Sequence, residues 1–237
     1  MKILAVNGSP KGNQGNTECI LQPFLEGARE AGATTETIYL KDKKINHCLG
    51  CFSCWCKTPG LCIHKDDMPE FMPELLQKIL QADILVYASP LYVFSVTGLM
   101  KDFMDRRLPL FTPAVKENNK RYFHSARDKG MSSKRTVLIS NCGFPGSYNF
   151  AGLVETFKVM TGGKLAATIL FTQGGLLKNK ELLDLLTPFF DTTRKSGKEL
   201  VEFGYIKSET QAILDKEILD PEIYQLEVNN FWKSLGV

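Results

Sequence analysis

Short apolar segments alternate with longer amphipathic segments along most of this chain. Five segments rich in apolar or branched residues are predicted strands: 2–8, 34–40, 82–90, 135–143 and 164–175. The runs "ILAV" at 3–6 and "ILVY" at 84–87 are apolar on both alternating faces. This is typical of strands in a parallel sheet that helices cover on each side. The stretches between the strands are predicted helices: 17–32, 67–81, 97–108 and 149–162.

This alternation predicts a doubly wound α/β domain with five parallel strands. Short connections and right-handed crossovers favour the flavodoxin-like strand order 2-1-3-4-5, in which ligands bind at the carboxyl edge of the sheet. The polar stretch 109–134 separates the third and fourth strands, and we expect an arm or lid over that edge, or a contact between subunits. We expect one domain, with a flavodoxin-like part at 1–178 and a helical extension at 179–237.

The composition is that of a water-soluble globular protein, with 43% hydrophobic residues, 23% charged residues and a net charge of +3. This small positive charge does not indicate a nucleic-acid partner or a membrane surface. No apolar run reaches the length of a membrane span. Asn7, Gly8 and Pro10 interrupt the apolar start too early for a signal peptide. We therefore expect a cytoplasmic protein.

The first predicted strand leads into a glycine-rich loop, "NGSPKGNQGNTE" at 7–18. Such a loop before a helix favours an anion, because free N–H groups and the helix dipole both attract negative charge. Its glycine spacing matches neither the Walker loop nor the dinucleotide fingerprint. Its donors are neutral apart from Lys11, which suits a monophosphate ester held without magnesium. The alternative is an ordinary turn in which Thr17 caps the helix.

Two further loops follow predicted strands at the same edge. Pro90 turns the chain, and Tyr92 and Phe94 come directly after it. These aromatic residues either flank a planar ring, with the N–H groups of 91–94 on its heteroatoms, or close the core. In the later loop, "NCGFPGSYNF" at 141–150, glycines permit close approach of the backbone, so that Cys142 and Phe144 would face a bound ligand.

The segments "GSPKGNQGNT", "SPLYVFSVTGLMKDFMDR" and "NCGFPG" together resemble the NAD(P)H-dependent FMN reductase branch of the flavodoxin-like superfamily. The resemblance covers most of residues 1–175. It implies an oxidoreductase in which FMN performs the chemistry without an acid–base triad, with NAD(P)H as electron donor. It implies that the FMN phosphate contacts Ser9, Lys11, Asn16 and Thr17. It also implies that the isoalloxazine ring lies against Pro90, Leu91, Tyr92, Val93 and Phe94, with Cys142 and Gly143 closing the pocket.

Five of the seven cysteines fall within "CLGCFSCWCKTPGLC" at 48–62. An odd count in a reducing compartment argues against a disulfide framework. The C-x2-C-x2-C spacing is typical of ferredoxin-type cluster loops, whereas zinc sites more often use two separate knuckles. Reduced thiols, reactive beside a flavin, are the third alternative. Because the cysteine-rich loop 47–66 follows the second strand, we expect it at the carboxyl edge as well.

The cysteine spacing resembles that of the iron–sulfur flavoproteins, a group within the same branch. The resemblance implies a [4Fe–4S] cluster on Cys48, Cys51, Cys54 and Cys62, with Cys56 as a spare, in a homodimer or homotetramer. Electrons would pass from a reductant to a small-molecule acceptor or a ferredoxin-like carrier. Two other functions remain open: an electron-transfer flavoprotein that ferredoxin reduces and that has no substrate of its own, and a sensor whose thiols report redox state.

Overall fold

The structure is a computed structural model, and it describes residues 1–163 and 165–236, apart from the side chains at 67–69, 72 and 132. Five strands form one parallel sheet: β1 (Lys2–Asn7), β2 (Thr34–Tyr39), β3 (Ile84–Pro90), β6 (Arg135–Asn141) and β7 (Leu165–Phe171). Their spatial order is β2-β1-β3-β6-β7. Counted within this sheet, that is the predicted flavodoxin-like order 2-1-3-4-5. The doubly wound α/β prediction is therefore confirmed.

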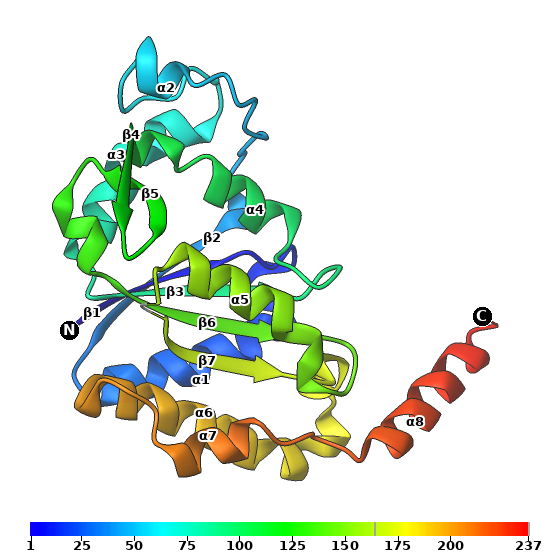
Figure 1. The fold of residues 1–237 in the computed structure, drawn as a ribbon. Helices are drawn as coiled ribbons and strands as arrows, with labels where there is room; N and C mark the ends of the chain where they lie inside the picture. The colour runs from blue at the N-terminus through cyan, green and yellow to red at the C-terminus, as the bar shows by residue number, and fades with distance from the viewer. Residues whose placement is uncertain (164, 237) are drawn as a thin grey trace.

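Helices cover both faces of the sheet (Figure 1). One face carries α1 (Asn16–Glu30) and α6 (Leu183–Phe203), and the other carries α3 (Asp67–Gln81), α4 (Gly98–Asp105) and α5 (Ala151–Met160). Each face has its own apolar core, and β1 contributes to both. Ile3 and Ala5 enter the core under α1, while Leu4 and Val6 enter the core on the opposite face. This double burial explains the uninterrupted apolar runs in the sequence.

The C-terminal extension is joined to the flavodoxin-like part through α6, which packs along α1. An added Cβ at Gly27 would lie 1.7 Å from the carbonyl oxygen of Arg194, and one at Gly197 would lie 1.9 Å from that of Phe24. Glycine at these two positions lets the two helix backbones touch. A short helix, α7 (Ser208–Leu214), then packs against α6 and buries Leu214 in the same core.

The last helix, α8 (Pro221–Ser234), points away from the sheet (Figure 1). Its first turn is anchored, since Tyr224 is buried, whereas Phe231 and Trp232 near its end are exposed. Within the described ranges, no helix combines the length and the apolar character needed to cross a lipid bilayer.

The polar stretch 109–134 forms a β-hairpin, which the sequence reasoning did not predict. Strands β4 (Phe111–Asn118) and β5 (Arg121–Ala126) pair antiparallel through a two-residue turn. Both turn residues, Asn119 and Lys120, have positive φ angles of 51° and 62°, which suits the twist of a tight hairpin. The hairpin lies beside α3 and below the short helix α2 (Ser53–Cys56), away from the carboxyl ends of the sheet strands (Figure 1). It therefore does not cover the carboxyl edge.

Candidate functional site

Three loops meet at the carboxyl edge of the sheet, after the neighbouring strands β1, β3 and β6. Hydrogen bonds join them directly. The Thr97 hydroxyl, after β3, donates to the carbonyl of Gly8 after β1, at 2.6 Å. The N–H of Leu91 donates to the carbonyl of Asn141 at the end of β6, at 2.8 Å. The loops that the sequence analysis singled out thus form one surface.

The first loop ends in a helix start that no side chain caps. A 3-10 turn (Gly12–Gln14) precedes α1, and Gly15 is the N-cap residue, without a side-chain hydrogen bond. The alternative prediction, in which Thr17 caps the helix, is therefore wrong. A Cβ at Gly15 would lie 2.4 Å from the Ser9 hydroxyl, so the loop closes tightly only with glycine there. The first N–H groups of α1 have no partner within the helix, which favours an anion at this point.

The structure places the four predicted phosphate contacts around this loop, but it engages two of their side chains elsewhere. The Thr17 hydroxyl donates to Oδ1 of Asn141 at 2.8 Å, so its only proton is used in joining two loops. The Asn16 amide donates one hydrogen to the carbonyl of Gly174 at 2.7 Å and keeps a second. Ser9 is buried in the loop, and Lys11 is exposed at its rim.

Two lysines that sequence reasoning missed also flank the first loop. The side chain of Lys41 lies against Gly12, where an added Cβ would approach its carbon atoms to 2.2 Å. The ammonium of Lys178 donates to the carbonyl of Gln14. The Lys41 ammonium pairs with Asp42 at 3.1 Å, whereas Lys178 and Lys11 bring positive charge to the loop, which further favours a phosphate. Their sequence positions gave no signal, because both approach the loop only through the fold.

A buried polar network supports the first loop from below. Glu18 accepts hydrogen bonds from the Asn7 amide at 2.7 Å and from the Tyr39 hydroxyl at 2.6 Å. Burial and the neighbouring Glu18 raise the pKa of Tyr39 to about 12. The other end of the Asn7 amide accepts from the N–H of Ser9 at 2.8 Å, which fixes the start of the loop.

The second loop presents an exposed aromatic turn. Tyr92 and Ser95 exchange two backbone hydrogen bonds, and Val93 and Phe94 between them have φ angles of 47° and 59°. Tyr92 and Phe94 are 53% and 58% exposed, so the alternative that they close the core is wrong. The N–H groups of Leu91 and Tyr92 are already bonded. Of the four N–H groups expected to face a ring, those of Val93 and Phe94 have no hydrogen-bond partner in the described part of the chain.

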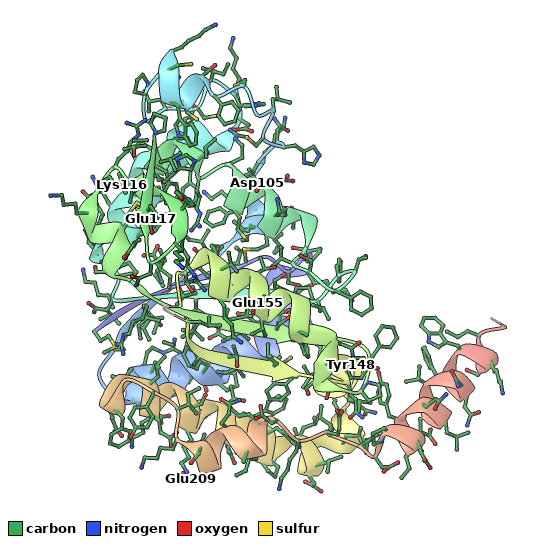
Figure 2. All side chains as sticks on the ribbon, in the orientation of Figure 1. Asp105, Lys116, Glu117, Tyr148, Glu155 and Glu209 are labelled. Atoms are coloured by element: carbon green, nitrogen blue, oxygen red, sulfur yellow. The ribbon has the colours of Figure 1, made fainter. Side chains whose placement is uncertain are left out.

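The third loop combines a buried thiol with exposed rings. Cys142 is buried beneath the loop, and burial raises the pKa of its thiol. The thiol donates to the carbonyl of Phe144 at 3.2 Å. Phe144 and Tyr148 are 62% and 75% exposed, and Figure 2 shows Tyr148 near α8. Exposed aromatic residues gathered around an edge of free backbone donors are typical of a ligand site.

The cysteine-rich loop forms a separate pocket. The four predicted ligands Cys48, Cys51, Cys54 and Cys62 all line it, whereas Cys56 does not. All seven cysteines are free thiols. In the described part of the chain, no three histidine, cysteine or carboxylate side chains are arranged to hold a single metal ion. The thiols are thus gathered around one small space without forming a preformed mononuclear site.

Two buried polar atoms test whether this pocket fits an iron–sulfur cluster. His64 and Arg106 both line it, and His64 Nε2 and Arg106 Nε have no hydrogen-bond partner among the described residues. The guanidinium of Arg106 is 1% exposed and contacts both oxygens of Asp66, at 2.6 and 2.9 Å. A cluster on four thiolates is negatively charged and accepts hydrogen bonds at its sulfurs. The unpartnered N–H at Nε of Arg106 fits such a group, and His64 Nε2 fits it as well when that nitrogen carries the proton.

The pocket does not lie where the sequence analysis expected it. The loop starts at the end of β2 but extends along α4: the His47 ring lies 2.6 Å from Asp102, and Trp55 Nε1 donates to the carbonyl of Leu108 at 3.2 Å. Asp105, at the end of α4, lines the pocket, and Figure 2 shows it apart from Tyr148, with α5 between them in this view. The expectation that the cysteines lie at the carboxyl edge was therefore wrong, because these long-range contacts hold the loop elsewhere.

The fold and these loops agree with the comparisons of the sequence. Residues 1–124 match the NADPH-dependent FMN reductase family, and the chain belongs to this family, as predicted. Several curated relatives carry a narrower name than the family, that of iron–sulfur flavoprotein. The chain is 38% identical over 145 residues to an iron–sulfur flavoprotein of Archaeoglobus fulgidus, covering 61% of this chain and 57% of that protein. It is 38% identical over 110 residues to an iron–sulfur flavoprotein of Methanocaldococcus jannaschii, covering 46% of this chain and 53% of that protein. The chain thus spans about half the length of these relatives.

Solved structures share the fold. An FMN-dependent NADH-azoreductase of Bacillus anthracis in complex with FMN superposes with a TM-score of 0.59 at 19% identity, covering 85% of this chain and 99% of that one. An NAD(P)H:quinone oxidoreductase of Methanothermobacter marburgensis superposes with a TM-score of 0.58 at 16% identity, covering 84% and 96%. At such low identity these likenesses show a common fold alone.

Proposed function

We propose that this protein is an FMN-dependent oxidoreductase that passes electrons from NAD(P)H to a small-molecule acceptor or a carrier protein. The observation that carries the proposal is the meeting of three loops at adjacent strand ends. One is a helix start that no side chain caps and that Lys11 and Lys178 flank, one is an exposed aromatic turn, and one is the loop around Cys142. FMN, when bound, supplies the exchange of one or two electrons.

The first loop would hold the phosphate. The N–H groups at the start of α1, the Ser9 hydroxyl and the remaining hydrogen of the Asn16 amide supply neutral donors, while Lys11 supplies charge. Thr17 takes part through its backbone N–H, since its hydroxyl is bonded to Asn141. We keep Ser9, Lys11, Asn16 and Thr17 as the proposed phosphate site on this basis.

The second and third loops would hold the ring. We assign the ring contacts to Pro90, Leu91, Tyr92, Val93, Phe94, Cys142 and Gly143. The N–H groups of Val93 and Phe94, which have no hydrogen-bond partner among the described residues, would bond ring heteroatoms. Cys142 is 3% exposed and packs in the core, so its thiol does not face the edge as expected; it would support the ring site from beneath, and burial, which raises the pKa of the thiol, favours its neutral form there. The exposed faces of Tyr92 and Phe94 leave room for a nicotinamide or an acceptor to stack.

We further propose that Cys48, Cys51, Cys54 and Cys62 bind a [4Fe–4S] cluster. The proposal is supported by their common pocket, by the unpartnered N–H at Nε of Arg106 and the unpartnered nitrogen Nε2 of His64 in its wall, and by the names of the curated relatives. The cluster would supply one-electron transfer. Free thiols and a zinc ion are the alternatives that metal analysis must separate from it.

We place the protein in the cytoplasm as a homodimer or homotetramer, with no nucleic-acid or membrane partner. The two other functions make different predictions. A ferredoxin-reduced carrier would bind FMN but would not accept electrons from NAD(P)H at catalytic rates. A thiol sensor would bind no flavin. These outcomes can be read from one set of spectra.

The first experiment is an anaerobic purification followed by a visible spectrum and counts of flavin, iron and acid-labile sulfide. We expect bound FMN, with iron and sulfide in equal amounts, and bleaching of the flavin when NADPH or NADH is added. A colourless protein that does not take up added FMN contradicts the oxidoreductase proposal. Bound FMN that ferredoxin reduces and NAD(P)H does not reduce favours the carrier.

Two serine substitutions, one at a proposed cluster ligand and one at a control cysteine, test the cluster site independently of the flavin site. We expect Cys62→Ser to lose iron and sulfide while FMN remains bound, because the pocket lies apart from the carboxyl edge. Cys56→Ser is the matched control, since Cys56 is in the same loop but outside the pocket lining. Equal iron contents in both variants would contradict the assignment.

Ser9→Ala tests the phosphate site: we expect roughly tenfold weaker binding of FMN and unchanged binding of riboflavin, which has no phosphate.

A further inference from the structure

The C-terminal extension crosses the carboxyl edge of the sheet before α8 begins. The segment 215–220 and the first turn of α8 lie against the loops that follow β6 and β7. The loop after β6 contains Cys142 and Gly143, the residues proposed to close the flavin pocket. The extension therefore contacts the loop that carries the proposed ring residues Cys142 and Gly143.

Glu217 joins the two loops through one carboxylate. Its Oε1 accepts from the N–H of Gly146 at 2.8 Å, and its Oε2 accepts from the Thr172 hydroxyl at 2.6 Å. Gly146 has a φ angle of 94°, a conformation that residues other than glycine rarely adopt. A charged acceptor makes a strong hydrogen bond to a backbone N–H. This bond is thus well suited to hold the loop in its unusual conformation.

Tyr224 holds the same loop at a second point. Its ring is buried, and its hydroxyl donates to the carbonyl of Gly143. Gly143 itself is exposed, so the loop has one face toward solvent and one face on Tyr224. Fixing the carbonyl of Gly143 also fixes the direction of the peptide that follows it.

Gln173 completes the connection. It is fully buried with a φ angle of 55°, and its side-chain amide pairs with both backbone groups of Leu219, each bond at 2.8 Å. The next N–H, that of Gly174, donates to the carbonyl of Cys142 at 2.6 Å. The C-terminal segment, the loop after β7 and the loop after β6 are therefore one hydrogen-bonded unit.

We propose that Glu217 and Tyr224 are positioning residues for the flavin ring. They hold the backbone of 142–146 in place beneath the ring, so that the pocket is formed before the ligand arrives. The inference rests on the proposed function, because it assigns these residues to the FMN site. It predicts that their loss weakens binding of the ring, while the backbone of residues 8–12, which neither side chain contacts, keeps its conformation.

The test compares Glu217→Ala and Tyr224→Phe with the wild-type protein in binding FMN and riboflavin. We expect each variant to bind both flavins about tenfold more weakly, by the same factor, since only the ring site is altered. Ser9→Ala differs, because it weakens FMN alone. Glu217→Gln keeps an acceptor for Gly146, and we expect it to restore most of the affinity. Glu222→Gln and Tyr205→Phe are matched controls, because both side chains are exposed.

Amide hydrogen exchange without flavin gives a second readout. We expect faster exchange at 143–149 in both variants and unchanged exchange at 8–12, which neither Glu217 nor Tyr224 contacts. The proposal is overturned if wild-type protein binds flavin and both variants bind it equally well. It is also overturned if the unfolding midpoint falls while both flavin affinities stay the same, since the residues then act on stability alone. A wild-type protein that binds neither flavin refutes the proposed function first, and the positioning role with it.

Discussion

Replacing Arg106 by glutamine should destabilise this protein more than any exposed charge substitution. The Arg106 side chain is 1% exposed and that of Asp66 is 0% exposed. The guanidinium bonds both Asp66 oxygens, and its Nη1 also donates to the carbonyl of Asn46 at 2.9 Å. Asp66 in turn accepts from the N–H of Asn46 at 2.9 Å. The pair thus fastens the cysteine-rich loop to the end of α4.

The magnitude follows from the burial of both charges. Two unit charges about 4 Å apart attract with about 4 kcal/mol at an effective dielectric constant of about 20. Removing one partner of a buried pair typically costs about 3–5 kcal/mol, because the other charge is left without compensation. We therefore expect Arg106→Gln to lower the free energy of unfolding by about 3–5 kcal/mol. This is a large share, because the free energy of unfolding of a whole protein is only about 5–15 kcal/mol.

Urea unfolding, followed by circular dichroism, measures this loss. Arg194→Gln is the matched control, because Arg194 pairs with Glu26 at the surface, where the two side chains are 47% and 41% exposed. We expect Arg194→Gln to lower the free energy of unfolding by less than about 1 kcal/mol. In a double-mutant cycle, adding Asp66→Asn to Arg106→Gln should cost much less than Asp66→Asn alone. If Arg106→Gln and Arg194→Gln lower the free energy of unfolding by the same amount within error, the reasoning is refuted.

Three further predictions concern helix packing and two titrating groups. Gly197→Ala should lower the free energy of unfolding by about 1–3 kcal/mol or more, since its Cβ meets a backbone oxygen, whereas Gly98→Ala, with open space around it, should not. Urea unfolding distinguishes them. The stability of the wild type should fall as the pH rises from about 10 to 12, because unfolded Tyr39 ionises first while the folded residue keeps its proton until about 12. Tyr39→Phe should show a shallower fall, and parallel curves would contradict this. In flavin-free protein at pH 8, Cys142 should react with iodoacetamide more slowly than exposed Cys56, as mass spectrometry would show, because burial raises the pKa of Cys142. Equal rates would refute that explanation.

The strands and the three edge loops were predictable from local pattern. Parallel strands buried on both faces need apolar residues in succession, and β1 and β3 have them. Consecutive βα units with right-handed crossovers leave few strand orders, so the carboxyl edge could be located before the structure was known. The loops at that edge then follow from the positions of Gly8, Pro90 and Asn141 in the chain.

The hairpin at 111–126 was missed for a physical reason. Its strands are exposed along most of their length, so no buried face imposes an alternating pattern. The cysteine-rich loop was misplaced for a different reason. The ion pair that holds it joins residues 40 positions apart, and neither Asp66 nor Arg106 differs in the sequence from a surface charge.

The sequence alone determined the sheet and its order, because apolar runs and right-handed crossovers decide these, and it indicated an anion at the carboxyl edge through neutral donors before a helix. The tertiary structure decided which donors are free. Thr17 gives its hydroxyl proton to Asn141, 124 residues away, and Glu217 and Tyr224 bond a loop 71 and 81 residues before them. A hydrogen bond is directional and used once, so only the folded chain fixes which groups remain to bind a ligand.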